Sequence, residues 1–564
     1  MSVTGRLWNL LSEDNSAPLL KRLLNVRGIV NEQDVDAFMH DTETLHDPFG
    51  LKDMKKAVAR IKEAVNAGQK IIVFGDYDVD GISGACILVH TLERIGANVS
   101  YRLPHRVNDG YGLTNDFIEE FQKIGVSLIV TVDCGISCKP QIDLAKDYGM
   151  DVIITDHHTI PDDFPSNAYA ILHPLQKDCN YAFPHLSGSG MAFKFASALL
   201  KDYLPEEEYK KEVDELCDLA CLGTVADLVP LKGENRVIVK RGLRGIHLGR
   251  WPGIEAIKEV AQINTDGSHW NADIIGYGLG PRINAAGRIS EPYFALQTLL
   301  GKKEFAKKLE ELNNERKEIT YKALNELNDI IQKKSKNEKI IIENSKDWHT
   351  GIIGLLAGKT AERHKKPVII MDDRGDELVG SSRSPEFFSM VDALSEVSDL
   401  LESFGGHTQA AGFTIKKENL AEFKQRMRKL AEDQLKVTQL KNTLDVDTLA
   451  SLAELDWSAL EDIASLAPFG VGNKKPRFLL KDIEVRNIYC IGSDKQHLRF
   501  DAFQDETLPE GGTTSRGLQV IGFNMGEHSK DLYDGRKINL VAHLDKNTWN
   551  GDTFLQLRLV DFEI

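Results

Sequence analysis

Three carboxylates alternate over five residues in the first quarter of the chain. Asp76, Asp78 and Asp80 stand in the stretch Gly-Asp-Tyr-Asp-Val-Asp-Gly, with Gly81 directly after them. Carboxylates this close raise one another's pKa unless a cation lies between them. Oxygen ligands suit hard divalent ions such as Mg²⁺ and Mn²⁺. The spacing therefore predicts a metal site.

Two other structures use the same residue types. An EF-hand loop also begins Asp-x-Asp-x-Asp-Gly, but it needs a glutamate at its twelfth position and a helix before the loop. Here the twelfth position is Ile87, and residues 70–74 are apolar and β-branched, as in a buried strand. These two features reject the EF-hand. A solvated acidic turn is the alternative that the three residues alone leave open.

The elements around this turn predict a doubly wound parallel sheet, because short apolar runs alternate with helical stretches. Strands are expected at residues 70–74, 99–104, 127–132, 151–155 and 168–172. Three of them end on the acidic turn, on Asp133, and on Asp156 with His157 and His158. The carboxyl ends of parallel strands share one edge of a sheet, so these groups should converge. A solvated turn does not predict three such strand ends, and the metal site is favoured.

Two further segments add acidic and glycine-rich features. Asp227 lies in an apolar helical stretch, residues 216–231, and needs a metal or an arginine as partner if it is buried. Residues 186–190 read Leu-Ser-Gly-Ser-Gly and open a helix, whose backbone N–H groups can meet an anion. Tight helix packing explains these glycines equally well.

Basic segments follow. Arg282, Asn284 and Arg288 lie close together, and arginine suits bidentate contact with phosphate. An ion pair with the acidic cluster is an equal alternative for the arginines. Two later loops, residues 380–384 and 405–412, combine free backbone donors with cationic or polar side chains, which suits phosphate recognition. Plain turns are the alternative there.

The chain of 564 residues is long enough for several domains. We predict an α/β architecture with a long linker helix and a terminal barrel. Five strands in about ninety residues suit a barrel of OB type, which commonly binds single-stranded nucleic acid. The predicted divisions are a helical cap on the first domain (1–65), a catalytic α/β domain (66–300), a long exposed connecting helix (301–337), a second, smaller substrate-binding α/β domain (338–435), and a linker with the barrel (436–564).

Composition narrows the class of protein. The net charge is −16, so any nucleic acid must meet a local basic groove. The seven cysteines show no zinc-finger spacing and are expected to be reduced thiols of a cytoplasmic protein. The sequence has neither a signal-peptide pattern at its beginning nor an apolar run of eighteen residues, so we expect no membrane partner.

Taken together, the motifs resemble the DHH phosphoesterase superfamily. Within it, their order resembles the RecJ family of exonucleases, which degrade single-stranded DNA from the 5′ end. The resemblance covers about residues 20–564. It rests on the motifs at 75–81, 132–135, 156–158, 282–288, 405–407 and 468–473.

The resemblance implies roles for the matched residues. One or two Mn²⁺ or Mg²⁺ ions would be held by Asp78, Asp80, Asp133, His157 and Asp227. Asp133 would bridge, Asp76 would be a nearby acid, and His158 would meet the scissile phosphate. The 5′ end would be received by Arg106, Ser382 and Arg383. Backbone phosphates would be held by Arg282, Asn284, Arg288, Gly405, Gly406 and His407. Many relatives carry a histidine four residues before the first metal aspartate, where this chain has Phe74.

The resemblance also implies single-stranded DNA as substrate, a role in DNA recombination and repair, and a single-stranded-DNA-binding protein and a helicase as partners. Two rival functions are a superfamily phosphodiesterase for short oligonucleotides or cyclic dinucleotides, and a non-catalytic nucleic-acid scaffold. Enzymes of the first kind usually lack a terminal barrel. A scaffold predicts lost ligands, whereas Asp76 and all five proposed metal positions keep a ligand-capable side chain.

Overall fold

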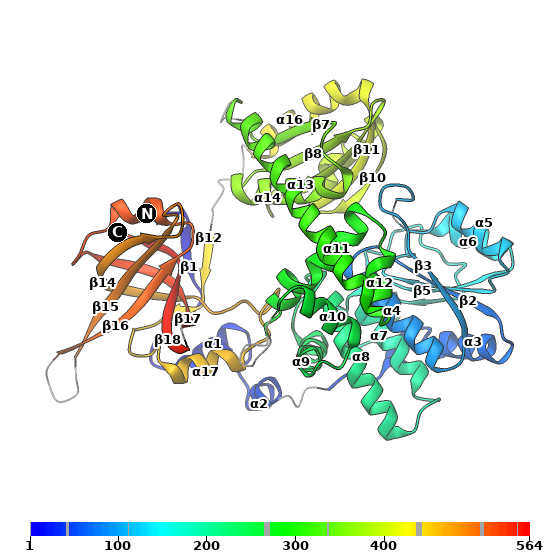
Figure 1. The fold of residues 1–564 in the computed structure, drawn as a ribbon, viewed down its shortest axis with the longest axis horizontal. Coiled ribbons are helices and arrows are strands. Elements are labelled where there is room, and N and C mark those ends of the chain that lie inside the picture. The colour runs from blue at the N-terminus through cyan, green and yellow to red at the C-terminus, as the bar shows by residue number, and fades with distance from the viewer. Residues whose placement is uncertain are drawn as a thin grey trace. The chain divides into compact units, whose positions relative to one another are not determined.

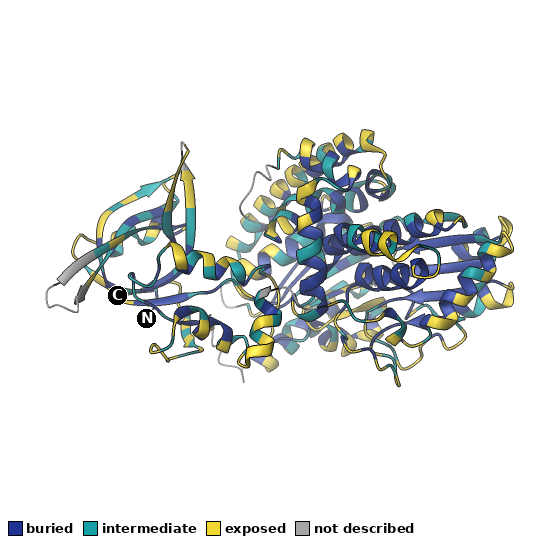
Figure 2. Cartoon of the chain, turned by 90° about the horizontal axis from the view of Figure 1, so that it is seen from below, coloured by how far each residue is buried: buried dark blue, intermediate teal, exposed yellow. Residues whose placement is uncertain are grey.

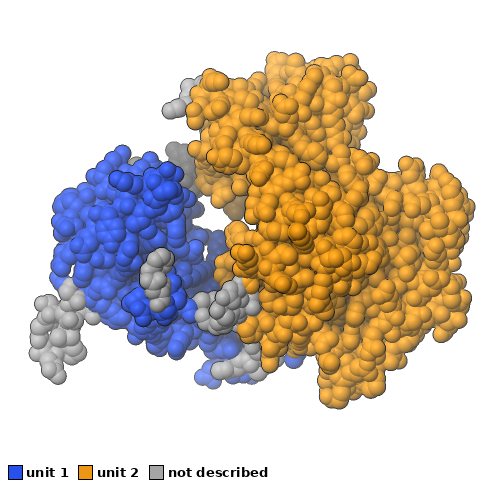
Figure 3. All heavy atoms as spheres, in the orientation of Figure 1, with its two compact units in different colours: residues 1–44, 230–232, 441–564 blue, residues 45–229, 233–440 orange. Residues whose placement is uncertain are grey.

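The computed structural model describes residues 2–40, 44–110, 112–263, 271–334, 338–435, 443–507, 513–549 and 551–564. The chain divides into two compact units, coloured separately in Figure 3. Unit 1 consists of residues 1–44, 230–232 and 441–564. Unit 2 consists of residues 45–229 and 233–440.

The first sheet of unit 2 is entirely parallel, which confirms the predicted doubly wound fold (Figure 1). Its strand order is β3-β2-β4-β5-β6, so the chain reverses direction across the sheet between β2 and β4. Ligands bind at this switch point in open α/β sheets. The strands are β2 (Lys70–Gly75), β3 (Asn98–Arg102), β4 (Leu128–Val132), β5 (Asp151–Thr155) and β6 (Ala170–Leu172).

Helices cover both faces of this sheet, because successive strand residues point to opposite sides. Ile72 and Phe74 pack with Phe117 and Phe121, which lie on the α5 side. On the other side α4 and α7 pack on each other and on the strands. The central strands are therefore buried on both faces, as Figure 2 shows. The helices of this body are α3 (Met54–Asn66), α4 (Val79–Arg94), α5 (Asn115–Lys123), α6 (Lys139–Asp147), α7 (Gly188–Leu200), α8 (Glu206–Ala226), α9 (Gly233–Leu248), α10 (Pro252–Val260), α11 (Gly280–Ile289) and α12 (Tyr293–Leu299).

A second sheet in unit 2 is mixed and has the order β10-β11-β9-β8-β7. Only β7 and β8 in it run parallel, and β10 is an edge strand. Its elements are β7 (Ile341–Ser345), α14 (Thr350–His364), β8 (Val368–Asp373), β9 (Glu377–Arg383), α15 (Met390–Ser395), β10 (Leu401–His407), β11 (Ala410–Lys416) and α16 (Leu420–Leu435).

A single long helix, α13 (Ala306–Gln332), connects the two sheets. It packs on α10, α11 and α12, while its Ala323 and Leu327 lie in one apolar cluster with Trp348 and Ile352. The predicted long helix is confirmed, but its expected exposure is wrong on the face that these contacts bury. The dense Lys and Glu residues of this segment describe only its solvated side.

Unit 1 contains a closed five-stranded barrel, which confirms the predicted OB type. Its order is β14-β15-β16-β18-β17, and β14 pairs with β17 to close it. The pairing of β16 with β18 is parallel and the other pairings are antiparallel. The strands are β14 (Phe478–Ile491), β15 (His497–Thr507), β16 (Thr513–Gly522), β17 (Lys537–Trp549) and β18 (Asp552–Glu563).

The beginning of the chain differs from the predicted cap on the first domain. Residues 1–44 belong to unit 1, and β1 (Leu7–Leu10) pairs with β12 (Thr443–Val446). Leu23 of α1 (Leu19–Val26) lies in one core with Ile463 of α17 (Trp457–Ser465) and with the barrel. An amphipathic pattern shows that a helix face will be buried, but it does not identify the surface that covers it.

In the described part of the chain, no helix is both long and apolar enough to cross a membrane. All seven cysteines are free thiols, and Cys86, Cys134, Cys217 and Cys221 are buried.

We predict that Leu23→Ala destabilises unit 1 by about 2–5 kcal/mol, because it leaves a cavity among residues far apart in sequence. Leu23 is 0% exposed, whereas Leu11 is 49% exposed. Leu11→Ala is therefore the matched control, with an expected change below about 0.5 kcal/mol. Chemical denaturation followed by circular dichroism measures both. Equal stabilities of the two variants would contradict the shared core.

Candidate active site

The register of the first sheet brings three aspartates together. Gly75 lies opposite Val132, and Val132 lies opposite Thr155, at the last residues of β2, β4 and β5. The next residue on each strand is an aspartate. The N–H of Asp76 donates to the carbonyl of Val132 at 3.3 Å, and that of Asp133 to the carbonyl of Thr155 at 3.0 Å. These three strand ends therefore meet at one edge, as expected.

Ligand atoms from this edge form three overlapping sets, each with all its atoms within 4.8 Å of one another. The sets are Asp76, Asp78 and Asp133; Asp80, His157 and Asp227; and Asp133, His157 and His158. Asp133 and His157 each belong to two of them. All predicted metal residues are thus brought together, including Asp227, which lies directly after α8.

His157 belongs to two of these sets. Its Nε2 is 3.1 Å from Asp133 Oδ1, 3.6 Å from Asp227 Oδ2 and 3.8 Å from Asp80 Oδ2. Burial lowers the pKa of His157. The neutral imidazole is the form that binds a metal ion.

The carboxylates of this edge carry more negative charge than the protein neutralises. Burial and then the charge of Asp78 raise the pKa of Asp76 to about 8. Burial and then Asp80 and Asp78 raise that of Asp227 to about 8, and burial and then Asp80 raise that of Asp133 well above its usual range. In addition, Asp76 Oδ1 is buried and has no hydrogen-bond partner among the described residues. Hard oxygen donors with this unmet charge fit a divalent cation.

Backbone N–H groups fix Asp80. Its two oxygens accept from Gly188 N at 2.6 Å and Ser189 N at 2.8 Å, at the beginning of α7. The anion that this glycine-rich helix terminus meets is therefore a carboxylate of the site itself. Packing also demands the glycine, because a Cβ on Gly188 would lie 2.5 Å from Asp133 Cβ.

Asp78 and Phe74 both stabilise the fold next to the acidic turn, Asp78 as a helix cap and Phe74 as a core residue. Asp78 caps α4 by accepting from the N–H groups of Asp80 at 2.9 Å and Gly81 at 3.1 Å. Phe74, four residues before Asp78, is fully buried with its ring centroid 5.3 Å from that of Phe117. Phe74 therefore belongs to the core and offers no ligand.

Asp156 is absent from the predicted site residues, yet it orients His158. Its Oδ1 accepts from His158 Nδ1 at 2.8 Å and from the N–H groups of His157 and His158, and its Oδ2 accepts from Ile136 N. Burial opposes ionisation of Asp156, but these hydrogen bonds outweigh it and lower its pKa to about 2. Burial likewise opposes charge on His158, but Asp156 raises the pKa of that imidazole to about 9. The strand-end position of Asp156 was the available sequence signal.

Four arginines form a cationic cluster beside the acidic edge: Arg106, Arg288, Arg316 and Arg383. Burial and then the charges of Arg106 and Arg316 lower the pKa of Arg288 to about 9. Burial and then Arg106 also lower the pKa of Arg383. Buried like charges need an anion, and arginine is well suited to phosphate. Arg316 was not predicted, because α13 carries so many charged residues that none stands out.

Two predicted substrate residues are engaged elsewhere. Arg282 forms an ion pair with Glu310 of α13 and donates to the carbonyl of Gly278 at 2.8 Å. Ser382 is fully buried and donates to the carbonyl of Ala411 at 2.8 Å. Strand alternation explains the second case, since Ser382 points away from the face that carries its neighbour Arg383.

The residue that shares the face of Arg383 is Ser381, whose hydroxyl accepts from Arg383 at 3.4 Å. Ser381, and not the predicted Ser382, therefore lies on the face of β9 that carries Arg383. On α11, Asn284 lies one turn before Arg288 and so on the same helix face. Arg288 itself donates to the carbonyl of Gly351 at 3.2 Å, which links α11 to α14.

The predicted loop at Gly405, Gly406 and His407 forms the exposed end of β10. The His407 ring lies nearly parallel to that of His158, at 7° and with 6.2 Å between centroids. Burial and then the charge of His158 lower the pKa of His407. The second sheet thus contributes a side chain directly beside the acid–histidine edge.

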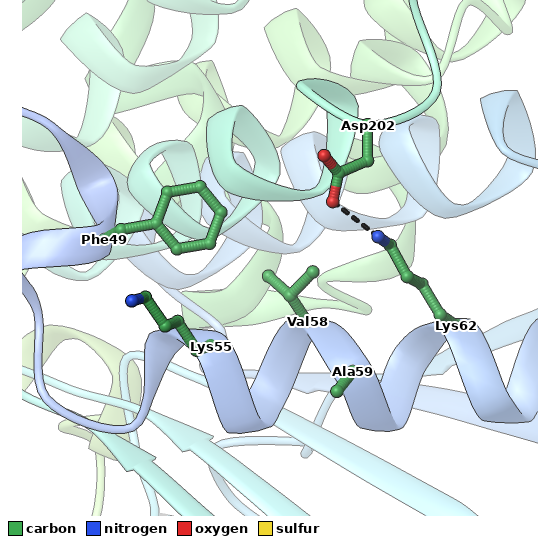
Figure 4. Close-up of a pocket in the computed structure, with 6 residues that line it drawn as sticks. All are labelled: Phe49, Lys55, Val58, Ala59, Lys62 and Asp202. Carbon is green, nitrogen blue, oxygen red and sulfur yellow. Dashed lines mark hydrogen bonds and ion pairs between the residues drawn. The ribbon is translucent and has the colours of Figure 1, made fainter.

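A separate surface pocket of about 340 Å³ is found in unit 2 (Figure 4). An ion pair between Lys62 and Asp202 crosses it, and Val58 forms part of its apolar lining. None of its lining residues belongs to the predicted site.

Comparisons with known proteins agree with this arrangement. Residues 70–224 match the DHH family, N-terminal domain; residues 337–433 match the DHHA1 domain; and residues 446–561 match the RecJ OB domain. The fold and the acid–histidine edge define the class of DHH-domain proteins.

Relatives narrow this class. The single-stranded-DNA-specific exonuclease RecJ of Bacillus subtilis is 33% identical over 98% of this chain and 69% of its own length. The protein of the same name from Escherichia coli is 32% identical over 96% and 95%. The chain belongs to the RecJ family. A crystal structure of RecJ from Thermus thermophilus in complex with Mn²⁺ matches with a TM-score of 0.81 and 28% identity, over 100% of this chain and 80% of that one.

We predict that the metal-free protein loses thermal stability between pH 7 and pH 9. In the fold, burial and neighbouring carboxylates raise the pKa of Asp76 and of Asp227 to about 8, and Asp156 raises the pKa of His158 to about 9. All three values lie above the unfolded values of about 3.9 and 6.5. The fold therefore holds protons that the unfolded chain releases, and stability falls as pH rises through this window.

Differential scanning fluorimetry in EDTA and in Mn²⁺ measures this effect. A bound cation takes the place of the protons on the carboxylates, so Mn²⁺ should flatten or reverse the decline. A melting temperature in EDTA that stays constant or rises from pH 7 to pH 9 would contradict the assignment.

Proposed function

We propose that this protein is a metal-dependent exonuclease that degrades single-stranded DNA from the 5′ end to mononucleotides. The observation that carries the proposal is the juxtaposition of two unneutralised clusters. One is the acid–histidine edge, and the other is the four-arginine cluster beside it. The relatives that bear the name single-stranded-DNA-specific exonuclease support this choice of substrate.

The cofactor is Mn²⁺ or Mg²⁺. RecJ structures contain either ion, and the donor set here fits both. One position is framed by Asp76, Asp78 and Asp133, and the other by Asp80, His157 and Asp227. When bound, two such ions activate water and stabilise charge on both oxygens of an in-line displacement.

The chain's own residues position and stabilise the phosphodiester. His158 is held charged by Asp156, with Nδ1 committed to that carboxylate. Its Nε2 is then the nitrogen that meets a phosphate oxygen and stabilises charge developing there. His407 lies beside it and contacts the next part of the strand.

The arginine cluster directs the enzyme to a phosphorylated chain end. A terminal phosphate carries more charge than a phosphodiester, so four arginines favour the chain end. Arg106 lowers the pKa of Asp76, and Asp78 opposes the lowering of the pKa of Arg288, which shows that the two clusters lie within electrostatic reach. An end phosphate held there places a bond close to the end at the metals, which favours release of single nucleotides.

The barrel supplies a further contact with the strand. A groove of about 650 Å³ on it includes Tyr489, Tyr533, Lys495 and Lys530 among its lining residues. Both tyrosines are partly exposed, at 42% and 62%. Exposed rings next to lysines suit stacked bases and their phosphates, without sequence preference.

The cellular setting follows from this substrate. Single-stranded DNA arises where a helicase unwinds duplex, and it is covered by single-stranded-DNA-binding protein, so both are proposed partners in recombination and repair. The free thiols agree with a cytoplasmic location.

Single-stranded DNA labelled at either end tests the function. With Mn²⁺, we expect mononucleotides from the 5′ end, and at least about a 100-fold loss with Asp133→Asn. Asparagine suits this position because Asp133 has a φ of 60° and asparagine tolerates left-handed backbone. Asp147→Ala, at an exposed site on α6, is the matched control and should keep full activity.

Each other outcome selects a rival. DNA that binds but stays intact in Mn²⁺ and in Mg²⁺ would indicate a scaffold. Cleavage restricted to oligomers of a few nucleotides would indicate a phosphodiesterase for small substrates.

We predict that Asp156→Asn lowers kcat on the order of 10²-fold or more while Mn²⁺ still raises the melting temperature. Asparagine keeps the shape but removes the charge that holds His158 protonated. Asp156→Asn combined with His158→Gln should cost little more than either change alone, because the two residues act as a unit. Loss of the Mn²⁺ effect in Asp156→Asn would show instead that Asp156 supports the metal site.

A further inference from the structure

Tyr77 lies between Asp76 and Asp78 in the sequence, and the guanidinium of Arg106 stacks on its ring. The guanidinium carbon of Arg106 lies 3.9 Å from the centroid of the Tyr77 ring. This distance is well within the range of a cation–π interaction, which is stronger where water is excluded. Tyr77 is half-buried in the turn.

Arg106 depends on this ring for its orientation. It lies in the segment after β3, outside any helix or strand. Among the described residues it makes no hydrogen bond or ion pair, and its Nε is buried without a partner. The stacking on Tyr77 is therefore the contact that holds the guanidinium in place. An arginine held by a ring face keeps its N–H groups directed outward for phosphate.

The backbone of Tyr77 also fixes the approach of α11. A Cβ on Gly287 would lie only 2.4 Å from the carbonyl oxygen of Tyr77, so α11 rests directly on this residue. The next residue of α11 is Arg288. Both Arg106 and Arg288 perturb the pKa of Tyr77. Two arginines of the cationic cluster, Arg106 and Arg288, are thus positioned against Tyr77, which lies between the carboxylates Asp76 and Asp78.

We propose that Tyr77 is a positioning residue that sets the distance between the terminal phosphate and the scissile bond. Through Arg106 it determines the preference for a 5′-phosphorylated end and the release of one nucleotide at a time. This inference rests on the proposed exonuclease function. It adds a residue that links the acidic turn, residues 76–80, to the arginine cluster.

The test compares single-stranded DNA with a 5′-phosphate and with a 5′-hydroxyl, in Mn²⁺. The readouts are the ratio of the two kcat/KM values and the length of the products. We expect Tyr77→Leu to lower the ratio about tenfold and to release dinucleotides, because the ring face is lost. Tyr77→Phe keeps a ring face and should keep most of the ratio. Tyr148→Leu, at an exposed tyrosine outside the site, is the matched control.

A double-mutant cycle with Arg106→Ala identifies the route. If Tyr77 acts through Arg106, adding Tyr77→Leu to Arg106→Ala leaves the phosphate preference unchanged. The Mn²⁺-induced rise in melting temperature shows for each variant that the fold and the metal site persist.

The remaining outcomes overturn the inference. A Tyr77→Leu enzyme that loses activity equally on both substrates would show a merely structural role. If it retains the wild-type ratio, positioning by Tyr77 is excluded while the exonuclease function stands. A wild-type enzyme without exonuclease activity would contradict the proposed function. A wild-type enzyme without preference for the 5′-phosphate would contradict end binding by the arginine cluster. Either result would also exclude the proposed role of Tyr77.

Discussion

Electrostatic repulsion at the carboxyl edge of the parallel sheet is the constraint on which the rest of the structure depends. The register of β2, β4 and β5 forces Asp76, Asp133 and Asp156 to be neighbours. The fold neutralises some of this charge itself, since α7 donates two N–H groups to Asp80 and His158 pairs with Asp156. Burial and the neighbouring carboxylates still raise the pKa of Asp76 and of Asp133, and Asp76 Oδ1 has no hydrogen-bond partner among the described residues. A divalent cation is the simplest way to stabilise the charge of these carboxylates. The folded protein therefore has too little positive charge at this edge, and a bound cation supplies it.

Glycines determine how closely the helices approach this edge. A Cβ on Gly188 of α7 would collide with Asp133, and one on Gly223 of α8 would lie 2.1 Å from Asp80 Oδ1. Gly287 does the same for α11 against the Tyr77 carbonyl. The backbones of these three helices therefore approach the acidic edge closely at these glycines. Carboxylates packed in this way have little room to rearrange, which preorganises a site built from separate parts of the chain.

The sequence predicted the convergence of the site because it depends on two simple rules, apolar runs and the shared edge of parallel strands. Details that depend on partners or on strand faces were not accessible. Ser382 was predicted as a substrate residue, but in the structure Ser381 is the serine that lies beside Arg383. The local sequence does not reveal which face of β9 is buried. Arg316 is one of many charged residues on α13, and only the tertiary fold separates it from them. Arg282 forms an ion pair with Glu310 of that same helix, α13. The spacing of the two residues in the sequence does not predict this pair.

The acidic edge and the arginine cluster lie within electrostatic reach, yet they do not neutralise each other. Arg106 lowers the pKa of Asp76, yet its Nε is buried without a hydrogen-bond partner in the described part of the chain. Direct pairing would satisfy both groups and leave no affinity for a ligand. Because the two clusters are held apart, the acidic edge can still bind a cation and the arginine cluster can still bind a phosphate. A bound cation adds positive potential that favours the phosphate, and by linkage the phosphate favours the cation to the same extent. If the arginine cluster holds a DNA end as proposed, the metal and that end are expected to favour each other's binding.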